Sequence, residues 1–276
     1  MNKIIYKEKL SDTVYLMRLE APMIAAEREP GQFIILQVEA DYGERIPLTI
    51  ADADPDEGSV TIVFQVVGKT TQLLCALNEG DHVEALVGPL GRPTHIENVG
   101  SVVCVGGGIG IAPLHPIAKA LKAAGNHVTT ILGARSKDLL IMEEQMRACS
   151  DELIICTDDG SYGQKELVTK PLDEVCKWNP RPNLAVCIGP PIMMKFCSET
   201  TRQYDVPTVV SLNAIMIDGT GMCGGCRVTV GGETKFVCVD GPEFDGHKVD
   251  FQNLMNRLSA YKDQEKDHVC NLDKFK

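Results

Sequence analysis

The first third of the chain alternates between apolar and polar positions in short runs. Such runs, separated by turn residues, predict the strands of a small antiparallel barrel. The runs cover residues 13–19, 32–38, 59–67 and 82–87, and a helix-like stretch follows Thr71. We therefore expect residues 1–98 to be an all-β barrel with one short helix.

From residue 101 the apolar positions become continuous instead of alternating. The runs lie at residues 102–105, 128–132, 153–156, 185–188 and 208–210. Helical segments separate them, the first from Leu114 to Ala124. Continuous apolar strands that alternate with helices are typical of a parallel sheet covered on both faces. Residues 99–213 are therefore predicted to form a doubly wound α/β domain.

The pattern changes again near the C-terminus. Residues 214–249 form a Gly- and Cys-rich loop region, and residues 250–276 read as a polar, helical tail. Four apolar residues of the tail fall on one helical stripe: Phe251, Leu254, Met255 and Leu258. We expect this tail to dock on a partner protein and to order only there; the alternative is that the stripe packs on this chain's own domains.

Composition and charge narrow the function. The 276 residues carry a net charge of -11 and no block rich in Lys and Arg, which argues against nucleic-acid binding. No window reaches 18 uninterrupted apolar residues, and the N-terminus lacks an apolar leader, so a cytoplasmic protein without membrane contact is expected. Of eleven cysteines, only Cys223, Cys226 and Cys238 are spaced like ligands; the others fit a reduced, apolar core.

A glycine-rich segment, Gly106-Gly107-Gly108-Ile109-Gly110-Ile111-Ala112-Pro113, follows a buried apolar run and opens a helix. In this context backbone N–H groups at the positive end of the helix can bind a pyrophosphate. The candidates are Gly107, Gly108, Gly110, Ala112 and Pro113. The alternative is a tight strand-to-helix turn without a ligand, and the spacing differs from the G-x-G-x-x-G pattern.

The strongest local signal is the segment from Asp218 to Cys226, followed by Cys238 after a predicted hairpin. Thiolates of Cys223 and Cys226 in a glycine-rich loop can reach one metal centre, and Cys238 returns across a turn. Against the plant-type C-x4-C-x2-C...C arrangement, Asp218 takes the first cysteine position. A structural zinc site, or a turn at Asp218 without metal, remains the alternative.

Together these segments resemble the ferredoxin-NADP reductase superfamily. Over nearly the whole length, the chain resembles the small subunit of NADH-dependent ferredoxin:NADP oxidoreductase and of sulfide dehydrogenase, in which one aspartate and three cysteines hold a [2Fe-2S] cluster. The dihydroorotate dehydrogenase electron-transfer subunit is similar but has four cysteines. The resemblance implies an FAD-binding barrel, an NAD-binding α/β domain and a cluster loop with Asp218, Cys223, Cys226 and Cys238 as ligands.

The resemblance also implies residue roles in flavin and nicotinamide binding. In the segment Arg45-Ile46-Pro47-Leu48-Thr49, Arg45 would meet the FAD pyrophosphate, Leu48 would cover the isoalloxazine and Thr49 would approach N5. Further flavin and nicotinamide contacts would come from Pro47, Gly68, Thr70, Thr71, Gly189 and Pro190. The alternatives are that this segment is an ordinary strand and that the threonines only cap a helix. Cys187 lies one position before the family's nicotinamide cysteine and is not expected to be catalytic.

The nucleotide is expected to be NAD more than NADP. Arg135 is the one arginine placed to meet a 2'-phosphate, whereas Asp158 and Asp159 would accept hydrogen bonds from a ribose diol and repel a dianion. The alternative is that the two aspartates only shape a turn.

These features imply an electron-transfer flavoprotein subunit that moves electrons between NADH, FAD and the cluster. A nicotinamide gives two electrons together, a [2Fe-2S] cluster takes one, and a flavin does both, so no acid-base residue is required. The family implies a larger iron-sulfur flavoprotein partner, resembling the small chain of glutamate synthase, and flavin-based electron bifurcation. The rivals are an electron-transfer subunit of sulfide dehydrogenase or dihydroorotate dehydrogenase, and a non-catalytic electron-carrier subunit.

Overall fold

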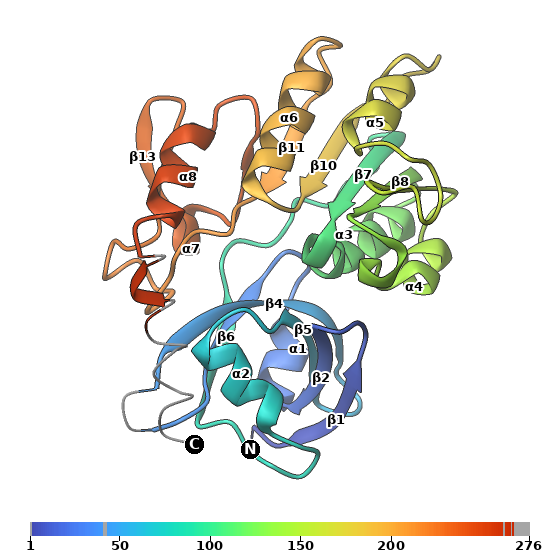
Figure 1. Cartoon of the computed structure of the whole chain (residues 1–276). Helices are drawn as coiled ribbons and strands as arrows, with labels where there is room; N and C mark the ends of the chain where they lie inside the picture. The colour runs from blue at the N-terminus through green and yellow to red at the C-terminus, as the bar shows by residue number, and fades with distance from the viewer. Residues whose placement is uncertain (1, 41–42, 262, 266, 268–276) are drawn as a thin grey trace.

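The computed structural model describes residues 2–40, 43–261, 263–265 and 267. An antiparallel sheet forms one half of the molecule, and an α/β layer with a small C-terminal lobe forms the other (Figure 1). The first sheet has the strand order β1-β2-β5-β4-β3-β6. Its strands are β1 Ile4–Lys9, β2 Val14–Glu20, β3 Phe33–Gln37, β4 Arg45–Asp54, β5 Ser59–Gln65 and β6 Ala85–Leu90.

This sheet curls around its own apolar core and nearly closes. The backbone N–H of Ile4 donates to Asp81 O at 2.8 Å, and that of Gly80 donates to Ile4 O at 2.8 Å. These bonds join β1 to the segment before β6, as in a barrel. Side chains such as Met17, Ile62 and Phe64 fill the inside because alternate strand residues face it. The expected antiparallel barrel is confirmed.

Two helices, not one, accompany the barrel. Helix α2 spans Lys69–Ala76 as expected, and α1 spans Pro22–Glu27. Proline stands in the first turn of α1, where its missing N–H has no helical partner to lose, and Ile24 is buried against the sheet. The single-helix expectation was wrong because a six-residue helix leaves almost no periodic signal.

The second sheet has the order β14-β11-β10-β7-β8-β9, and only β14 runs antiparallel to its neighbour. Its strands are β7 Ser101–Gly107, β8 His127–Ala134, β9 Glu152–Thr157, β10 Leu184–Ile188, β11 Thr208–Ser211 and β14 Glu243–Asp245. Its helices are α3 Ile111–Ala123, α4 Glu143–Ala148, α5 Thr169–Cys176 and α6 Pro191–Arg202, with short 3-10 turns η1 Gly108–Gly110 and η2 Lys137–Leu139.

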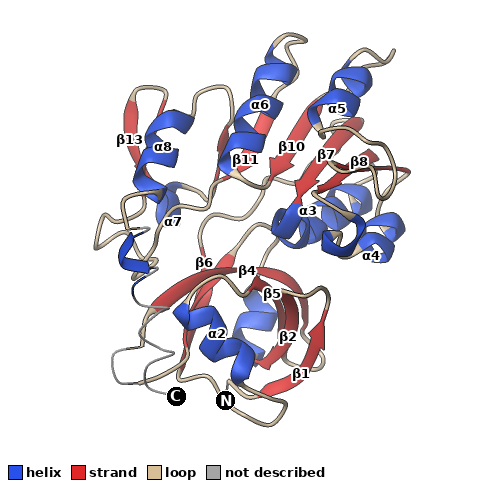
Figure 2. Ribbon diagram, in the orientation of Figure 1, coloured by secondary structure: helices blue, strands red, loops and turns tan. Residues whose placement is uncertain are grey.

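Helices cover both faces of this sheet (Figure 2). Val102 and Cys104 pack with α3 and α4, whereas Val103 and Val105 pack with α5 and α6. Successive residues of β7 thus point to opposite helical layers, which explains its unbroken apolar run. The predicted doubly wound α/β fold is confirmed.

The C-terminal lobe is a small hairpin with two helices. It contains β12 Arg227–Val230, β13 Glu233–Phe236, α7 Val237–Asp240 and α8 Phe251–Leu258. Gly231 and Gly232 form the hairpin turn with φ of +60° and +82°, which glycine adopts without strain. The lobe shares one apolar core with α5, α6 and the barrel residues Phe33 and Ile35.

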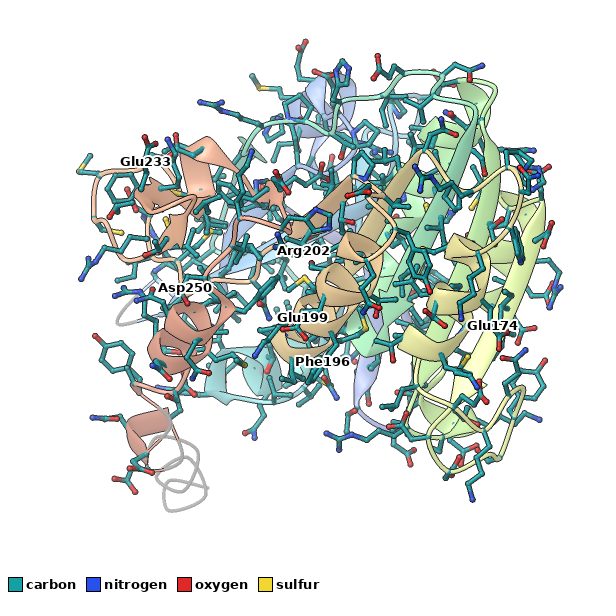
Figure 3. All side chains as sticks on the ribbon, turned by 90° about the horizontal axis from the view of Figure 1, so that it is seen from above. Glu174, Phe196, Glu199, Arg202, Glu233 and Asp250 are labelled. Atoms are coloured by element: carbon teal, nitrogen blue, oxygen red, sulfur yellow. The ribbon has the colours of Figure 1, made fainter. Side chains whose placement is uncertain are left out.

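Helix α8 belongs to that core. Phe251 and Leu254 are 6% and 1% exposed, and α8 lies beside α6, as the positions of Phe196 and Asp250 in Figure 3 show. The expectation that this helix orders only against a partner was therefore wrong; its apolar stripe serves the chain's own fold. Most of the expected tail beyond Tyr261 lies outside the described residues. No helix in the described part of the chain is long and apolar enough to cross a membrane.

Candidate functional site

Two glycine loops meet at the carboxyl edge of the parallel sheet. One follows β7 and the other follows β10, and these strands are neighbours where the strand order reverses. A Cβ at Gly110 would lie 2.7 Å from Gly189 Cα, and one at Gly189 would lie 3.2 Å from Gly107 O. Glycine is needed here because the two backbones approach so closely. Ligands of open α/β sheets bind at such a crossover.

The first loop presents an open backbone to this crevice. Gly108 has φ +55°, and a Cβ added there would touch nothing within 4 Å. Ala112 and Pro113 lie in the first turn of α3, directly after η1. Backbone N–H groups at a helix start attract anions, so this loop and the start of α3 fit a nucleotide pyrophosphate. Pro190 is the N-cap residue of α6 beside them.

Cys187 faces away from this crevice. It is fully buried in the core on the α6 side, whereas Ile188 packs on the α3 side. A hydrogen bond with Cys197 and burial raise the pKa of the Cys187 thiol well above its ordinary value. This thiol stays protonated and shielded, which agrees with its exclusion from catalysis.

The two aspartates after β9 differ in their roles. The Asp159 carboxylate accepts the Ser161 N–H at 2.9 Å, and hydrogen bonds from Ser161 lower the pKa of Asp159. Asp159 therefore shapes the turn, as in the alternative interpretation. Asp158 is exposed and immediately follows β9. Arg135, also exposed, immediately follows the neighbouring strand β8.

The segment predicted to bind flavin forms the first half of β4. Pro47 pairs with Ile35 and Thr49 with Phe33, so these residues share the outer face of the barrel. Leu48 pairs with Ile34 and packs against the barrel interior. Leu48 and Thr49 therefore point to opposite faces.

The starts of β4 and α2 lie side by side. The Thr70 hydroxyl donates to the Glu44 carboxylate at 2.8 Å, and Glu44 directly precedes Arg45. Arg45 is exposed and donates from Nε to Gln37 Oε1 at 3.3 Å. The structure thus brings together the two segments that sequence analysis assigned to FAD.

The first turn of α2 offers backbone donors rather than a free Thr71 hydroxyl. Thr71 Oγ1 accepts the Gly68 N–H at 3.0 Å and donates to Gly68 O. The first helical bond runs from Gln72 N–H to Gly68 O, so the N–H groups of residues 69–71 have no partner within the helix. These groups fit an anion such as a flavin pyrophosphate. A Cβ at Gly68 would touch nothing within 4 Å, which leaves room for approach.

The predicted ligands of the C-terminal loop fall into two pairs. Cys226 Sγ and Cys238 Sγ are 3.2 Å apart, and both residues are buried. Burial and the Cys226 hydrogen bond raise the pKa of Cys238 to about 12. Hydrogen bonds from the Cys223 thiol and the Thr220 hydroxyl hold the pKa of Asp218 well below its usual range. Asp218 is thus paired with Cys223, and Cys226 with Cys238.

This pairing fits the ligand arrangement of a [2Fe-2S] cluster. Each iron of such a cluster takes two protein ligands, whereas a structural zinc ion gathers four ligands around one point. Within the described ranges, no three His, Cys, Asp or Glu side chains gather at a single point. Asp218 Oδ1 is buried and has no hydrogen-bond partner there, as expected of an oxygen that meets a metal.

Sequence reasoning missed several contacts around these sites. Met193 fills the space beside Gly107 and Gly189, and Glu44 contacts the α2 threonine. Met193 follows Gly189 in the same segment but is far along the chain from Gly107, as Glu44 is from Thr70, so local spacing carries no signal for these two long-range contacts. A cavity of about 560 Å³ lined by Arg202, Thr208 and His247 lies at the opposite, amino edge of β11. None of the predicted site residues lines this cavity.

The sequence comparisons agree with this geometry. Residues 213–250 match the family described as the iron-sulfur cluster binding domain of dihydroorotate dehydrogenase B. A Thermotoga maritima protein named as a homolog of the dihydroorotate dehydrogenase B (NAD(+)) electron transfer subunit is 51% identical over 96% of this chain and 93% of its own length. A Methanocaldococcus jannaschii protein, named as a probable subunit of this kind, is 38% identical over 81% of each chain.

Solved structures extend the comparison. A structure of the NADH-dependent reduced ferredoxin-NADP oxidoreductase, described in connection with flavin-based electron bifurcation, contains a similar chain. It has 49% identity, a TM-score of 0.93, and covers 99% of this chain and 98% of its own. The cytochrome b5 reductase domain of Ulva prolifera nitrate reductase has 19% identity and a TM-score of 0.59 over 73% of this chain and 91% of its own, which shows the shared fold.

The fold and the site define a ferredoxin-NADP reductase-like flavoprotein with an added iron-sulfur domain. The iron-sulfur domain and the reductase fold support three cofactors, namely FAD, a [2Fe-2S] cluster and NAD(H). The chain belongs to the family of dihydroorotate dehydrogenase B electron transfer subunits and their homologues. It is accordingly an electron-transfer subunit of a flavin-dependent oxidoreductase, and such a subunit works with a larger partner chain.

Proposed function

We propose that this chain oxidises NADH and delivers single electrons to a larger iron-sulfur flavoprotein resembling the small chain of glutamate synthase, as the input subunit of an NADH-dependent reduced ferredoxin:NADP oxidoreductase. The observation that carries the proposal is Asp218. It stands in the first ligand position, pairs with Cys223 and keeps one buried oxygen without a hydrogen bond. The similar chain of the bifurcating enzyme supports the same assignment.

We assign the residues to three binding sites, for the nicotinamide nucleotide, the flavin and the cluster. The glycine loop of Gly107, Gly108 and Gly110, whose backbone is open at Gly108, would bind the nicotinamide nucleotide, with Gly189 and Pro190 beside it. Exposed Asp158 favours a ribose diol over a 2'-phosphate, because a carboxylate repels a dianion.

The flavin would lie on the barrel. Arg45 and the N–H groups at the start of α2 would bind its pyrophosphate, and Thr49 would offer a hydroxyl on the outer face of β4. Bound FAD supplies the conversion between a two-electron donor and a one-electron acceptor. The chain's own part is to bind and orient, so we assign no acid-base residue.

The surface around the cluster ligands supports exit of electrons to a partner. Met222 is 87% exposed between Asp218 and Cys223, and Ile217 and Val239 beside the ligands are also exposed. Large apolar side chains gathered at one exposed point are typical of protein interaction sites.

A second candidate is electron transfer to a dihydroorotate dehydrogenase. The names of several relatives favour it, among them the Desulforamulus reducens subunit, which is 35% identical over 90% of this chain. Asp218 weighs against it, since the resemblance associates four cysteines with that enzyme.

Purification of the complex from native cells distinguishes the candidates. We expect a larger iron-sulfur flavoprotein to copurify, and NADH to reduce both subunits. A dihydroorotate dehydrogenase as the copurifying chain would select the second candidate. Absence of NADH-dependent dye reduction by the full chain would leave only a non-catalytic electron carrier.

A further inference from the structure

The cluster loop touches the barrel at one crowded point. Gly219 follows Asp218 and has φ +75°. A Cβ at Gly219 would lie 2.7 Å from Ile35 Cγ1 and 2.9 Å from Leu90 Cδ1. Ile35 is 2% exposed and belongs to the same core as Cys226 and Cys238. The loop therefore rests directly on strands β3 and β6.

The same barrel face carries the residues assigned to the flavin. Ile35 pairs with Pro47, and Phe33 pairs with both Thr49 and Leu90. Side chains of directly opposed residues lie on one face of a sheet. The cluster loop and the flavin segment thus share the outer surface of β3, β4 and β6, with Ile35 and Phe33 in common.

We propose that the contact of Gly219 with Ile35 and Leu90 sets the distance between flavin and cluster and thereby the rate of electron transfer between them. This inference rests on the proposed function for the presence of both cofactors. Gly219 is a positioning residue, since its own atoms need not touch either group. It acts because the absent side chain lets Asp218 approach the barrel.

A small displacement here has a large effect on electron transfer. The probability of electron tunnelling falls exponentially with the distance between two centres. A methyl group at Gly219 has no free space, because protein cores are close-packed and transmit strain. Leu90 has room to adjust, but Ile35 is held in the core at 2% exposure, so we expect the loop carrying Asp218 and Cys223 to move away from β3.

The segment after Cys238, which lies beside the cluster loop, is held to the barrel, so movement is directed to the loop itself. Arg92, just after β6, donates from its backbone N–H to Gly241 O at 2.7 Å. Its side-chain Nε donates to Val239 O at 3.0 Å. These bonds hold the segment after Cys238 against the barrel.

The test compares Gly219→Ala with Gly224→Ala in the full holoprotein. Gly224 lies in the same loop with φ +66°, but a Cβ there would find its nearest neighbour, Phe236 Cε1, at 3.6 Å. Both variants carry the backbone strain of a left-handed alanine, and only the first adds crowding. Flavin and iron contents are measured first, and ferricyanide reduction by NADH shows that hydride transfer from NADH to the flavin is intact.

Two measurements report the distance between the flavin and the cluster. Rapid mixing with NADH should show severalfold slower cluster reduction relative to flavin reduction in Gly219→Ala, with Gly224→Ala like the parent. Electron paramagnetic resonance should show weaker magnetic coupling between the one-electron-reduced flavin and the reduced cluster, because dipolar coupling falls with the cube of the distance.

A second variant tests the inference even if Gly219→Ala loses the cluster. The double change Gly219→Ala with Ile35→Ala removes the crowding Cγ1 and Cδ1 atoms of Ile35 and gives the Leu90 side chain space to move aside, so it should restore the cluster or the coupling. Failure of this rescue, unchanged coupling in Gly219→Ala, or an equal effect in Gly224→Ala overturns the inference. A parent chain that lacks FAD or iron would instead refute the proposed function.

Discussion

Replacing Glu243 with glutamine should make the protein more stable at alkaline pH. Glu243 lies on β14 where the α/β domain meets the barrel, and its carboxylate accepts the Thr94 hydroxyl at 2.6 Å. Burial raises the pKa of Glu243 to about 7, against the opposing effect of the Thr94 hydrogen bond. No charged side chain contributes to this shift.

The sign and size follow from proton linkage. The folded chain holds this proton more tightly than the unfolded chain, where a glutamate titrates near about 4.3. Its contribution to stability is therefore complete below about pH 4.3 and is lost as pH rises through about 7. At roughly 1.4 kcal/mol for each pKa unit, ionisation of Glu243 costs ~4 kcal/mol at pH 8 and above.

Thermal unfolding of the holoprotein between pH 5 and 8.5 measures this effect. The midpoint of Glu243→Gln should exceed that of the parent by several degrees at pH 8.5, and the gap should narrow steadily as the pH falls through about 7 towards 5. Glu174→Gln on the exposed side of α5 (Figure 3) is the matched control and should follow the parent. Parallel curves for Glu243→Gln and the parent would show that Glu243 is not buried in its ionised form.

Other changes test the separate sites. Asp218→Cys should keep the cluster but lower its reduction potential, because a thiolate donates more charge to iron than a carboxylate; an unchanged potential in a redox titration would mean that Asp218 is not a ligand. Gly110→Ala should abolish NADH-dependent dye reduction and retain FAD, since the methyl group collides with the neighbouring glycine loop; normal NADH kinetics would contradict this. NADH should have the higher kcat/KM, and Asp158→Ser should narrow the gap to NADPH more than Asp159→Ser, because Asp159 holds a turn. Leu254→Ala should lower the free energy of unfolding by about 2–5 kcal/mol, and a loss near zero in denaturant titration would restore the docking role of α8.

The sequence was sufficient for the elements with a strong periodic signal. The alternating run at 59–67 became β5, and the apolar run at 185–188 became β10. Strand β14 has three residues and forms because it pairs with β11, so no local sequence pattern predicts it. The stripe on α8 was visible, but amphipathicity alone does not tell which surface a helix covers.

The candidate site likewise has features that the sequence predicts and features that depend on the three-dimensional fold. Spacing located Cys223, Cys226 and Cys238, because ligands in a short loop must lie close together. It could not predict that Cys238 meets Cys226 and not Cys223, which depends on how the β12–β13 hairpin returns the chain. Nor could it distinguish a threonine that caps α2 from one that binds a ligand, since both need a hydroxyl at a helix start.

Whether the chain passes electrons from NADH to a [2Fe-2S] cluster is tested most directly on the NADH-reduced full chain. The measurements are metal analysis, sulfide analysis and electron paramagnetic resonance. We expect iron and acid-labile sulfide in equal amounts and the signal of a reduced [2Fe-2S] cluster. Cys226→Ser should remove that signal and leave FAD in place. The control is Cys75→Ser in α2, where Cys75 packs against the barrel core away from the cluster loop; it should leave both the signal and FAD unchanged. Zinc without sulfide, or reduced flavin without a cluster signal, would show that this loop holds no [2Fe-2S] cluster.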